Sequence, residues 1–324
     1  MTYPRRSFLR FSLGGAIAFA APRHARALDY PTRPVRLIEG YGAGGTPDLV
    51  SRLIAQWLSE RLGQPFVVEN RDGASGNIAT EMVATAAPDG YTLLTCASAN
   101  AINPALYKLN FNFLRDIAPI GGLIRVPLVL LTNPAFPVAD FQGFLTYAKT
   151  NPGKFNMATP GKGTPMHVAV DMLKMMTGVD IIEIPYRGPA PAFADLLAGQ
   201  VNGFIITVPA ALGYVRAGKL KALAVASAKR LGVLPDTPAI AEAVPGYEAA
   251  AWDGMGAPSR TPAEIIAKLN ATINAGLADP QITKRLNDLG GEPMPMTPAE
   301  FGKFLVDETD KWAKVIAFAG GKPQ

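Results

Sequence analysis

One recurring unit most constrains the fold of this chain: a short apolar run, a turn rich in glycine or proline, and an amphipathic segment. Apolar runs of this length are typical of buried strands, and apolar residues at helical spacing are typical of helices packed on a sheet. The turns of this kind lie at 42–48, 71–77, 159–164 and 185–188. Their alternation predicts an α/β fold with a parallel sheet, whose strand ends share one ligand-binding edge.

The first of these turns, at 42–48, is the strongest candidate site. Thr46 is a candidate helix cap, Pro47 suits the first helical position, and Asp48 places a carboxylate at the positive end of the helix dipole. Glycines let the backbone approach a ligand closely, and free N–H groups at a helix start bind anions. The turn therefore predicts an anion site.

The remaining segments extend the pattern into two lobes. A helix is expected at 47–62, ended by Gly63, and a new unit is expected from the apolar strand 126–131. Segment 247–257 is expected to cross back to the first lobe. Further helices are predicted at 79–86, 141–149, 165–176, 189–198, 262–277, 280–289 and 298–318, and further strands at 35–38, 66–69, 91–96, 155–158, 180–184, 203–206 and 222–227. Two lobes joined by a double crossover predict a hinged clamp.

Residues 1–27 have the layout of a cleaved export signal. A charged start precedes the apolar run 11–21 and the small-residue site Ala25-Arg26-Ala27. Arg5-Arg6-Ser7-Phe8-Leu9-Arg10 resembles the twin-arginine type, with an ordinary Sec signal as the alternative. Since no apolar run is long enough to span a bilayer, we expect a periplasmic protein without a membrane anchor.

Charge argues against a nucleic-acid partner. The chain has a net charge of +5, but residues 1–27 hold five arginines and no acid, so the remainder is formally neutral. A grip on phosphate backbones needs clustered excess Lys and Arg. Cys96 is the only cysteine, so no internal disulfide can form, and we expect it to be a small buried core residue.

The sequence contains few residues that could carry out catalysis or bind a metal ion. Residues 73–77 come near the G-x-S-x-G elbow, but Asn77 stands at its last position and only His167 remains as a base for Ser75 once the signal is removed. One histidine, one cysteine and no carboxylates at ligand spacing argue against a metal site. His167 is equally well explained as a capping or core residue. The methionines at 166, 172, 175 and 176 and Trp312 are expected in the core, and Trp252 and Tyr247 in hinge packing.

Dinucleotide binding is a further possibility, because Gly42 and Gly44 follow a first strand and Glu69 ends the second. The fingerprint needs its third glycine at position 47, which is proline here, and a G-x-x-x-x-G-K-[ST] loop is absent. The alternative is that these glycines serve only as tight turns. Four such turns at one sheet edge favour a site instead.

At this point the motifs match a known family. Over essentially its whole mature length the chain resembles the Bug/TctC receptors of tripartite tricarboxylate transporters. The matching stretches are 30–38 (Tyr30-Pro31-Thr32-Arg33-Pro34-Val35-Arg36-Leu37-Ile38), Gly44-Gly45-x-x-Asp48, Val67-Val68-Glu69-Asn70-Arg71 with Gly73 and Gly76, Pro88-Asp89-Gly90-Tyr91-Thr92-Leu93-Leu94, Asn103-Pro104-x-Leu106-Tyr107, Asn151-Pro152-Gly153-Lys154, Pro185-Tyr186-Arg187-Gly188, Gly218-Lys219-Leu220, Glu300-Phe301 and Lys311-Trp312.

The resemblance implies a type II periplasmic binding protein-like fold of two doubly wound α/β lobes, with no cofactor, closing on a small organic carboxylate. Lobe 1 would comprise 28–126 and 250–324, and lobe 2 would comprise 127–249, with the cleft between them. Its partners would be membrane subunits of the transporter, and we expect a monomer. The ligand-binding residues carried over are Tyr41, Ala43, Gly44, Gly45, Asp48, Ser75, Gly76, Thr159, Gly161, Thr164, His167 and Tyr186.

Two departures from the family pattern concern the ligand. The family usually reads Pro-Phe-Pro-Pro-Gly-Gly in the first loop, whereas this chain has Gly40-Tyr41-Gly42-Ala43-Gly44-Gly45. The loss of the prolines raises the conformational freedom of the unbound loop, and Tyr41 adds a hydroxyl. Glu39 would repel an anion if it pointed into the pocket, so we expect it to point away or the ligand to be atypical. The alternatives that remain are an α/β hydrolase acting on a small anionic ester through Ser75, and a ligand-sensing partner of a membrane signalling protein.

Overall fold

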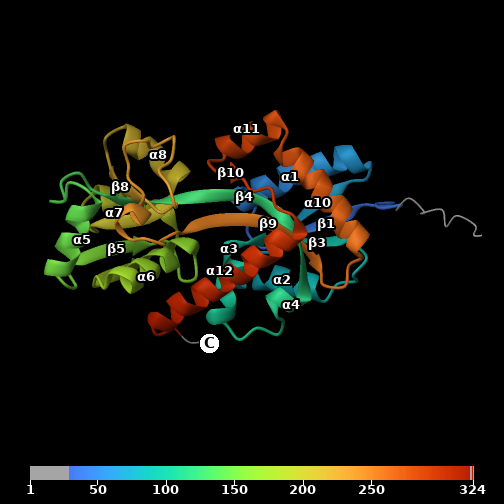
Figure 1. Ribbon diagram of the computed structural model, residues 1–324, viewed down its shortest axis with the longest axis horizontal. Helices are drawn as coiled ribbons and strands as arrows, with labels where there is room; N and C mark the ends of the chain where they lie inside the picture. The colour runs from blue at the N-terminus through green and yellow to red at the C-terminus, as the bar shows by residue number, and fades with distance from the viewer. Residues whose placement is uncertain (1–28, 322, 324) are drawn as a thin grey trace, which may run out of the picture.

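In the computed structural model, which describes residues 29–321 and 323, ten strands form one continuous sheet with helices on its faces (Figure 1). The strand order is β2-β1-β3-β9-β4-β7-β5-β6, and β8 and β10 also pair with β4. Figure 1 shows an elongated molecule in which β4 and β9 run between two groups of helices. We call the side with β1, β2, β3 and β10 lobe 1, and the side with β5, β6, β7 and β8 lobe 2.

Lobe 1 is built on parallel strands. β1 (Val35–Glu39) lies between β2 (Phe66–Asn70) and β3 (Thr92–Ala97) and pairs in parallel with both. Its first crossover helix, α1 (Thr46–Leu62), ends as predicted at Gly63, which adopts the left-handed conformation. The other elements of this lobe are η1 (Ala74–Gly76), α2 (Asn77–Ala84), α3 (Ser98–Ile102), η2 (Asn103–Ala105), α4 (Phe113–Asp116), α10 (Ala263–Leu277), α11 (Pro280–Asp288) and β10 (Glu292–Pro293).

The long strand β4 (Ile117–Thr132) joins the two lobes. Its first part pairs antiparallel with β9 (Ala250–Pro258) from Ile117 to Pro127, and its last part, from Leu128, pairs antiparallel with β7 and β8. The return crossing of the chain by β9 agrees with the prediction for segment 247–257. The apolar run 126–131 is the second half of a strand that begins nine residues earlier, and not the start of a new unit.

Lobe 2 repeats the strand-turn-helix unit. β5 (Phe155–Thr159) pairs in parallel with β6 (Ile181–Pro185) and with β7 (Gly203–Thr207). The lobe also contains β8 (Lys221–Val225) and the helices α5 (Phe141–Thr150), α6 (Pro165–Thr177), α7 (Pro189–Leu197), α8 (Val208–Arg216) and α9 (Ile240–Ala243). The sequence patterns identified all of these except α8; for α9 the prediction was one short helix within a surface loop at 234–245.

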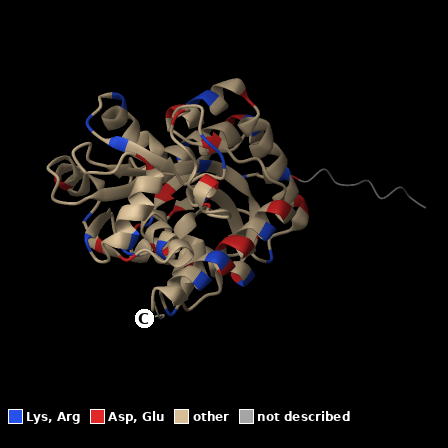
Figure 2. Cartoon of the chain, turned by 60° about the vertical axis from the view of Figure 1, so that its left-hand side comes forward, with Lys and Arg blue, Asp and Glu red and all other residues tan. Residues whose placement is uncertain are grey.

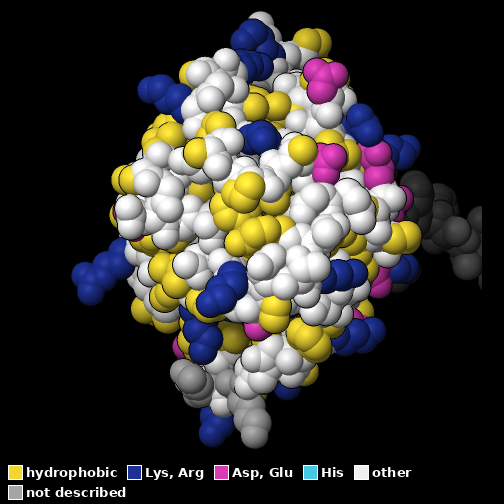
Figure 3. Space-filling model, turned by 90° about the vertical axis from the view of Figure 1, so that its left-hand side faces the viewer, with side chains coloured by type: hydrophobic (Ala, Val, Ile, Leu, Met, Phe, Trp, Pro, Cys, Tyr) yellow, Lys and Arg dark blue, Asp and Glu magenta, His cyan; other side chains and the backbone are white. Residues whose placement is uncertain are grey.

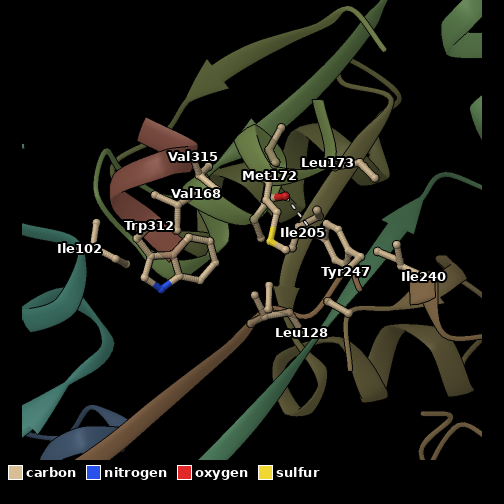
Figure 4. Packing of buried hydrophobic residues seen from close by; sticks show 14 of the residues in the cluster. Ile102, Leu128, Val168, Met172, Leu173, Ile205, Ile240, Tyr247, Trp312 and Val315 are labelled. Atoms are coloured by element: carbon tan, nitrogen blue, oxygen red, sulfur yellow. Dashed lines mark hydrogen bonds between the residues drawn. The ribbon is translucent and has the colours of Figure 1, made fainter. Parts of the chain in front are cut away.

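The C-terminal helix α12 (Pro298–Phe318) packs across the two lobes (Figure 1). Its buried Trp312 lies beside Ile102 of lobe 1 and Val168 of lobe 2 in one hydrophobic cluster (Figure 4). Tyr247, buried in the same cluster, donates a hydrogen bond from its hydroxyl to the carbonyl oxygen of Ala169 at 2.8 Å. The helix thus adds a third connection between the lobes beside β4 and β9.

Three local predictions were wrong. Gly45, not Thr46, is the N-cap of α1, and Thr46 is its first helical residue, so no side chain caps this helix. The sheet is mixed, because the two strands that cross between the lobes run antiparallel to their neighbours. Met166, Met175 and Met176, expected in the core, are only partly buried. Met172 and Cys96 are buried as predicted.

Charged residues of both signs alternate over the surface helices (Figure 2), in keeping with the neutral balance of the chain after residue 27. At the end of the molecule formed by lobe 2, Lys and Arg side chains are scattered among apolar and polar groups (Figure 3). Of the helices in the described part of the chain, none is long and apolar enough to cross a membrane.

Candidate ligand cleft

A cleft of about 310 Å³ lies where the two lobes meet along β4 and β9. Lobe 1 supplies the turns that follow β1, β2 and β3, and lobe 2 supplies the starts of α6, α7 and α8. The residues that line it are Tyr41, Thr46, Pro47, Ser75, Ala97, Ser98, Ala99, Val126, Gly163, Thr164, Pro165, Met166, Pro189, Ile206, Thr207, Ala210, Ala251, Trp252 and Asp253. No lysine or arginine is among them, and most of the lining is apolar.

Four helices begin at this cleft. Thr46 and Pro47 start α1, Pro165 starts α6, and Pro189 starts α7, each at or beside the first helical position. The fourth, α8, is capped by Thr207. Because a helix start presents unpaired N–H groups and the positive end of the dipole, these starts give the cleft a positive potential without a cationic side chain. Met166, assigned to the core from the sequence, lies here instead.

Asp48 organises the first loop from inside. Its carboxylate is 2% exposed and accepts hydrogen bonds from the Gly44 N–H at 2.9 Å, the Arg52 guanidinium at 3.0 Å and the Asn70 amide at 2.8 Å. These partners outweigh the desolvation of the group, so the pKa of Asp48 falls to about 2. Asp48 does not line the cleft. Ala43, Gly44 and Gly45 form the exposed loop that it holds in place.

The second loop is held in a strained conformation. Ala74 and Ser75 both have positive φ values, 46° and 55°, which non-glycine residues rarely adopt. The Asn103 amide donates to the Ser75 carbonyl at 2.9 Å and to the Asn77 side chain at 2.8 Å, which fixes this turn at the cleft. Strain of this kind is usually found at functional sites, where the surrounding structure maintains it.

The two loops pack backbone to backbone. A side chain at Gly40 would place its Cβ 2.9 Å from the Gly76 Cα, so this contact requires glycine at position 40. The Gly76 carbonyl accepts a buried hydrogen bond from the Thr80 hydroxyl at 2.9 Å. Tyr41, which the resemblance assigned to the site, lines the cleft beside this contact.

Two acids lie at this end of the sheet, and only one was singled out from the sequence. Glu39, at the end of β1, is fully buried and accepts a hydrogen bond from the Ser51 hydroxyl at 2.7 Å; it does not line the cleft. Asp253, in the middle of β9, does line the cleft and is 5% exposed. The sequence did contain a signal for Asp253, which is an acid inside the apolar run 247–257. Because a buried carboxyl needs a specific partner, such an acid indicates a binding role.

The lobe 2 residues predicted to bind ligand are divided between different places. Thr164 lines the cleft, and its hydroxyl donates to the Gly161 carbonyl at 2.8 Å. Thr159 and His167 instead line a second hollow. The Tyr186 hydroxyl donates to Asp195 at 2.6 Å, outside both. Of the twelve predicted site residues, the cleft lining therefore brings together Tyr41, Ser75 and Thr164.

The second hollow contains a cluster that the sequence spacing did not reveal. His167 Nε2 lies 3.8 Å from an Asp171 oxygen and 3.6 Å from a Glu183 oxygen, which is a spacing that a metal ion could bridge. The expectation that no carboxylates cluster with the histidine was therefore wrong: Asp171 lies one turn further along α6, and Glu183 comes from β6. Lys174 already supplies a cation, with its Nζ 2.9 Å from Glu183. Burial lowers the pKa of His167, and burial with the neighbouring Glu183 raises that of Asp171.

Known proteins place the chain in a family. Residues 50–320 match the family described as "Tripartite tricarboxylate transporter family receptor", TctC. The chain belongs to this family. The chain is 36% identical to protein BugT of Bordetella pertussis over 297 residues, which is 90% of this chain and 91% of BugT.

Among solved structures, Rpa4515 of R. palustris with adipate is 38% identical, has a TM-score of 0.78, and aligns over 91% of this chain and all of its own. MatC from Rhodopseudomonas palustris with bound malate is 34% identical, with a TM-score of 0.72, covering 89% of this chain and all of MatC. The structure of the periplasmic binding protein BugD is 36% identical, has a TM-score of 0.75, and aligns over 91% of this chain and all of BugD. These relatives confirm the two-lobed α/β fold.

The TctC family consists of solute-binding receptors and not of enzymes. The geometry also argues against the hydrolase alternative. His167, the only histidine after residue 28, lies in the second hollow with Asp171 and Glu183, whereas Ser75 lines the cleft. Ser75 thus has no histidine beside it to act as a base.

Proposed function

We propose that this TctC-family receptor captures a small organic carboxylate in the cleft between its lobes. It then delivers the ligand to the membrane subunits of a tripartite tricarboxylate-type transporter. The observation that carries the proposal is the convergence of four helix starts on one cleft that contains no cationic side chain. The adipate and malate bound by two relatives agree with a carboxylate ligand. The family name supports the transporter partner.

The same proposal assigns the remaining parts of the chain. Residues 1–27, which lie outside the described residues, would be the export signal that takes the protein to the periplasm. Segments 28–126 and 250–324 would move against 127–249 as rigid lobes of a monomer, with β4 and β9 as the hinge. A ligand that contacts both lobes binds the closed state better and so favours closure.

Thermal-shift and calorimetric titration with adipate, malate, aromatic acids, amino acids and neutral compounds test the cleft. A true ligand at a hundredfold excess over its dissociation constant stabilises the folded state by about 2.7 kcal/mol and raises the melting temperature with concentration. Ala210→Trp, which fills the cleft, should abolish the shift, and Ala267→Trp on the exposed face of α10 should not. Stabilisation by uncharged compounds alone would contradict the anion site.

A further inference from the structure

The Asp253 carboxyl in the cleft has no partner within the described chain. It lies on β9 opposite Ala97 of β3 and is 5% exposed, and that small exposed part faces the cleft. No described group hydrogen-bonds to it or forms an ion pair with it. A carboxyl that is more than nine-tenths buried and unpaired is costly, so its presence in a ligand cleft indicates that the ligand supplies the partner.

The titratable groups around Asp253 do not supply a positive charge either. The titratable groups that act on it and its neighbours are Glu39 of β1, Tyr41 and Cys96, and none of them is a cation. Glu39 also has a buried oxygen, Oε1, without a hydrogen-bond partner. Burial, with a further contribution from Glu39, raises the pKa of Asp253 well above its usual range. A ligand carboxylate placed against Asp253 would therefore meet an acid and no cation.

The cleft therefore contains groups for a negative part of a ligand and groups for a positive part. The starts of α1, α6, α7 and α8 offer N–H groups to an anion, and Asp253 offers acceptor oxygens to a donor. A protonated Asp253 could also donate to a carboxylate, but the helix starts already supply donors for that group. The volume of about 310 Å³ suits a ligand of amino-acid size.

Resting on the function proposed above, we propose that the cleft selects an aminocarboxylic acid. The helix starts hold its carboxylate, and Asp253 accepts hydrogen bonds from its protonated amino group. Asp253 is then the residue that separates aminocarboxylates from dicarboxylates, because an ammonium completes the unpaired carboxyl whereas a second carboxylate repels it.

Matched ligand pairs test this selection. Malate and aspartate differ by a hydroxyl against an ammonium, and adipate and 6-aminohexanoate differ by a terminal carboxylate against an ammonium. We expect the amino member of at least one pair to bind tenfold or more tightly than its partner by isothermal titration calorimetry. Asp253→Asn should remove at least tenfold of that affinity, whereas binding of the dicarboxylate should stay the same or become tighter, because the repulsion is removed. Asp236→Asn, at an exposed acid of lobe 2, is the matched control.

The outcomes separate the two proposals. Binding of dicarboxylates with no tighter binding of their amino partners would overturn the selection and leave the carboxylate receptor intact. Tighter binding of an aminocarboxylate that Asp253→Asn leaves unchanged would overturn the role of Asp253. Binding of no carboxylate of either kind, by a protein that melts cooperatively, would contradict the proposed function itself. Should Asp253→Asn fail to fold, the preference of the unmodified protein within each pair still decides the selection.

Discussion

Replacing Glu39 by Gln should change how the stability of this protein depends on pH. Glu39 is fully buried at the end of β1 and accepts a hydrogen bond from the Ser51 hydroxyl, which in turn lies 2.8 Å from the Thr95 hydroxyl. Burial is the main cause that raises the pKa of Glu39 to about 7, and hydrogen bonds from Ser51, the Tyr41 backbone and Thr95 only partly oppose it. Gln keeps the shape and an acceptor oxygen but cannot ionise.

The magnitude follows from the two pKa values of Glu39. The group has an ordinary pKa of 4.5 when the chain is unfolded, so between pH 4.5 and about 7 the folded state holds the proton more tightly. Stability from this group is therefore fully present below pH 4.5 and is lost as the pH rises to about 7. With about 1.4 kcal/mol for each pH unit, the free energy of unfolding should fall by about 3 kcal/mol relative to the Gln variant.

Urea unfolding of the unmodified protein and the Glu39→Gln variant between pH 4.5 and 8 measures this difference directly. The two free energies of unfolding should diverge by about 3 kcal/mol in favour of the variant as the pH rises, and then run parallel above about pH 7.5. Glu264→Gln, at an exposed position on α10, controls for the loss of one surface charge. Parallel curves for the unmodified protein and Glu39→Gln over the whole range would refute the reasoning.

Two further substitutions test other buried carboxylates. Asp48→Ala should cost about 2 kcal/mol of unfolding free energy at pH 7 and weaken ligand binding, because Gly44 and the rest of the first loop lose their acceptor. Since the pKa of Asp48 is lowered to about 2, its contribution disappears as the pH falls from about 4 to about 2, so the two proteins should unfold alike near pH 2; unchanged affinity at pH 7 would remove Asp48 from the support of the site. Glu308→Ala should cost about 3 kcal/mol, because Glu308 accepts buried hydrogen bonds from the indoles of both Trp252 and Trp312 at 3.0 Å. Urea unfolding followed by tryptophan fluorescence measures this loss, Glu308→Gln should cost less, and a loss under about 1 kcal/mol in the Ala variant would contradict the role.

Much of the architecture was predictable because its signals are local. Gly63 ends α1 in the left-handed conformation, and α6 and α12 begin at the prolines where they were expected. Alternation of apolar runs with helices indicated the α/β class. The antiparallel pairing of β4 and β9 was not predictable in this way, because a single run of apolar residues does not specify its partner or direction.

In the candidate site, too, some features follow from local sequence and others depend on contacts between distant residues. The sequence predicted glycine-rich turns and helix starts at one sheet edge, and from them an anion site, since backbone N–H groups at a helix start need no distant partner. Only the tertiary structure placed Asp253 of β9 in the cleft, and only it moved His167 into a separate hollow with Glu183. These placements depend on strand pairing between residues far apart in the chain. The proposed preference for a ligand amino group at Asp253 therefore depends on contacts between distant residues, which no local sequence pattern specifies.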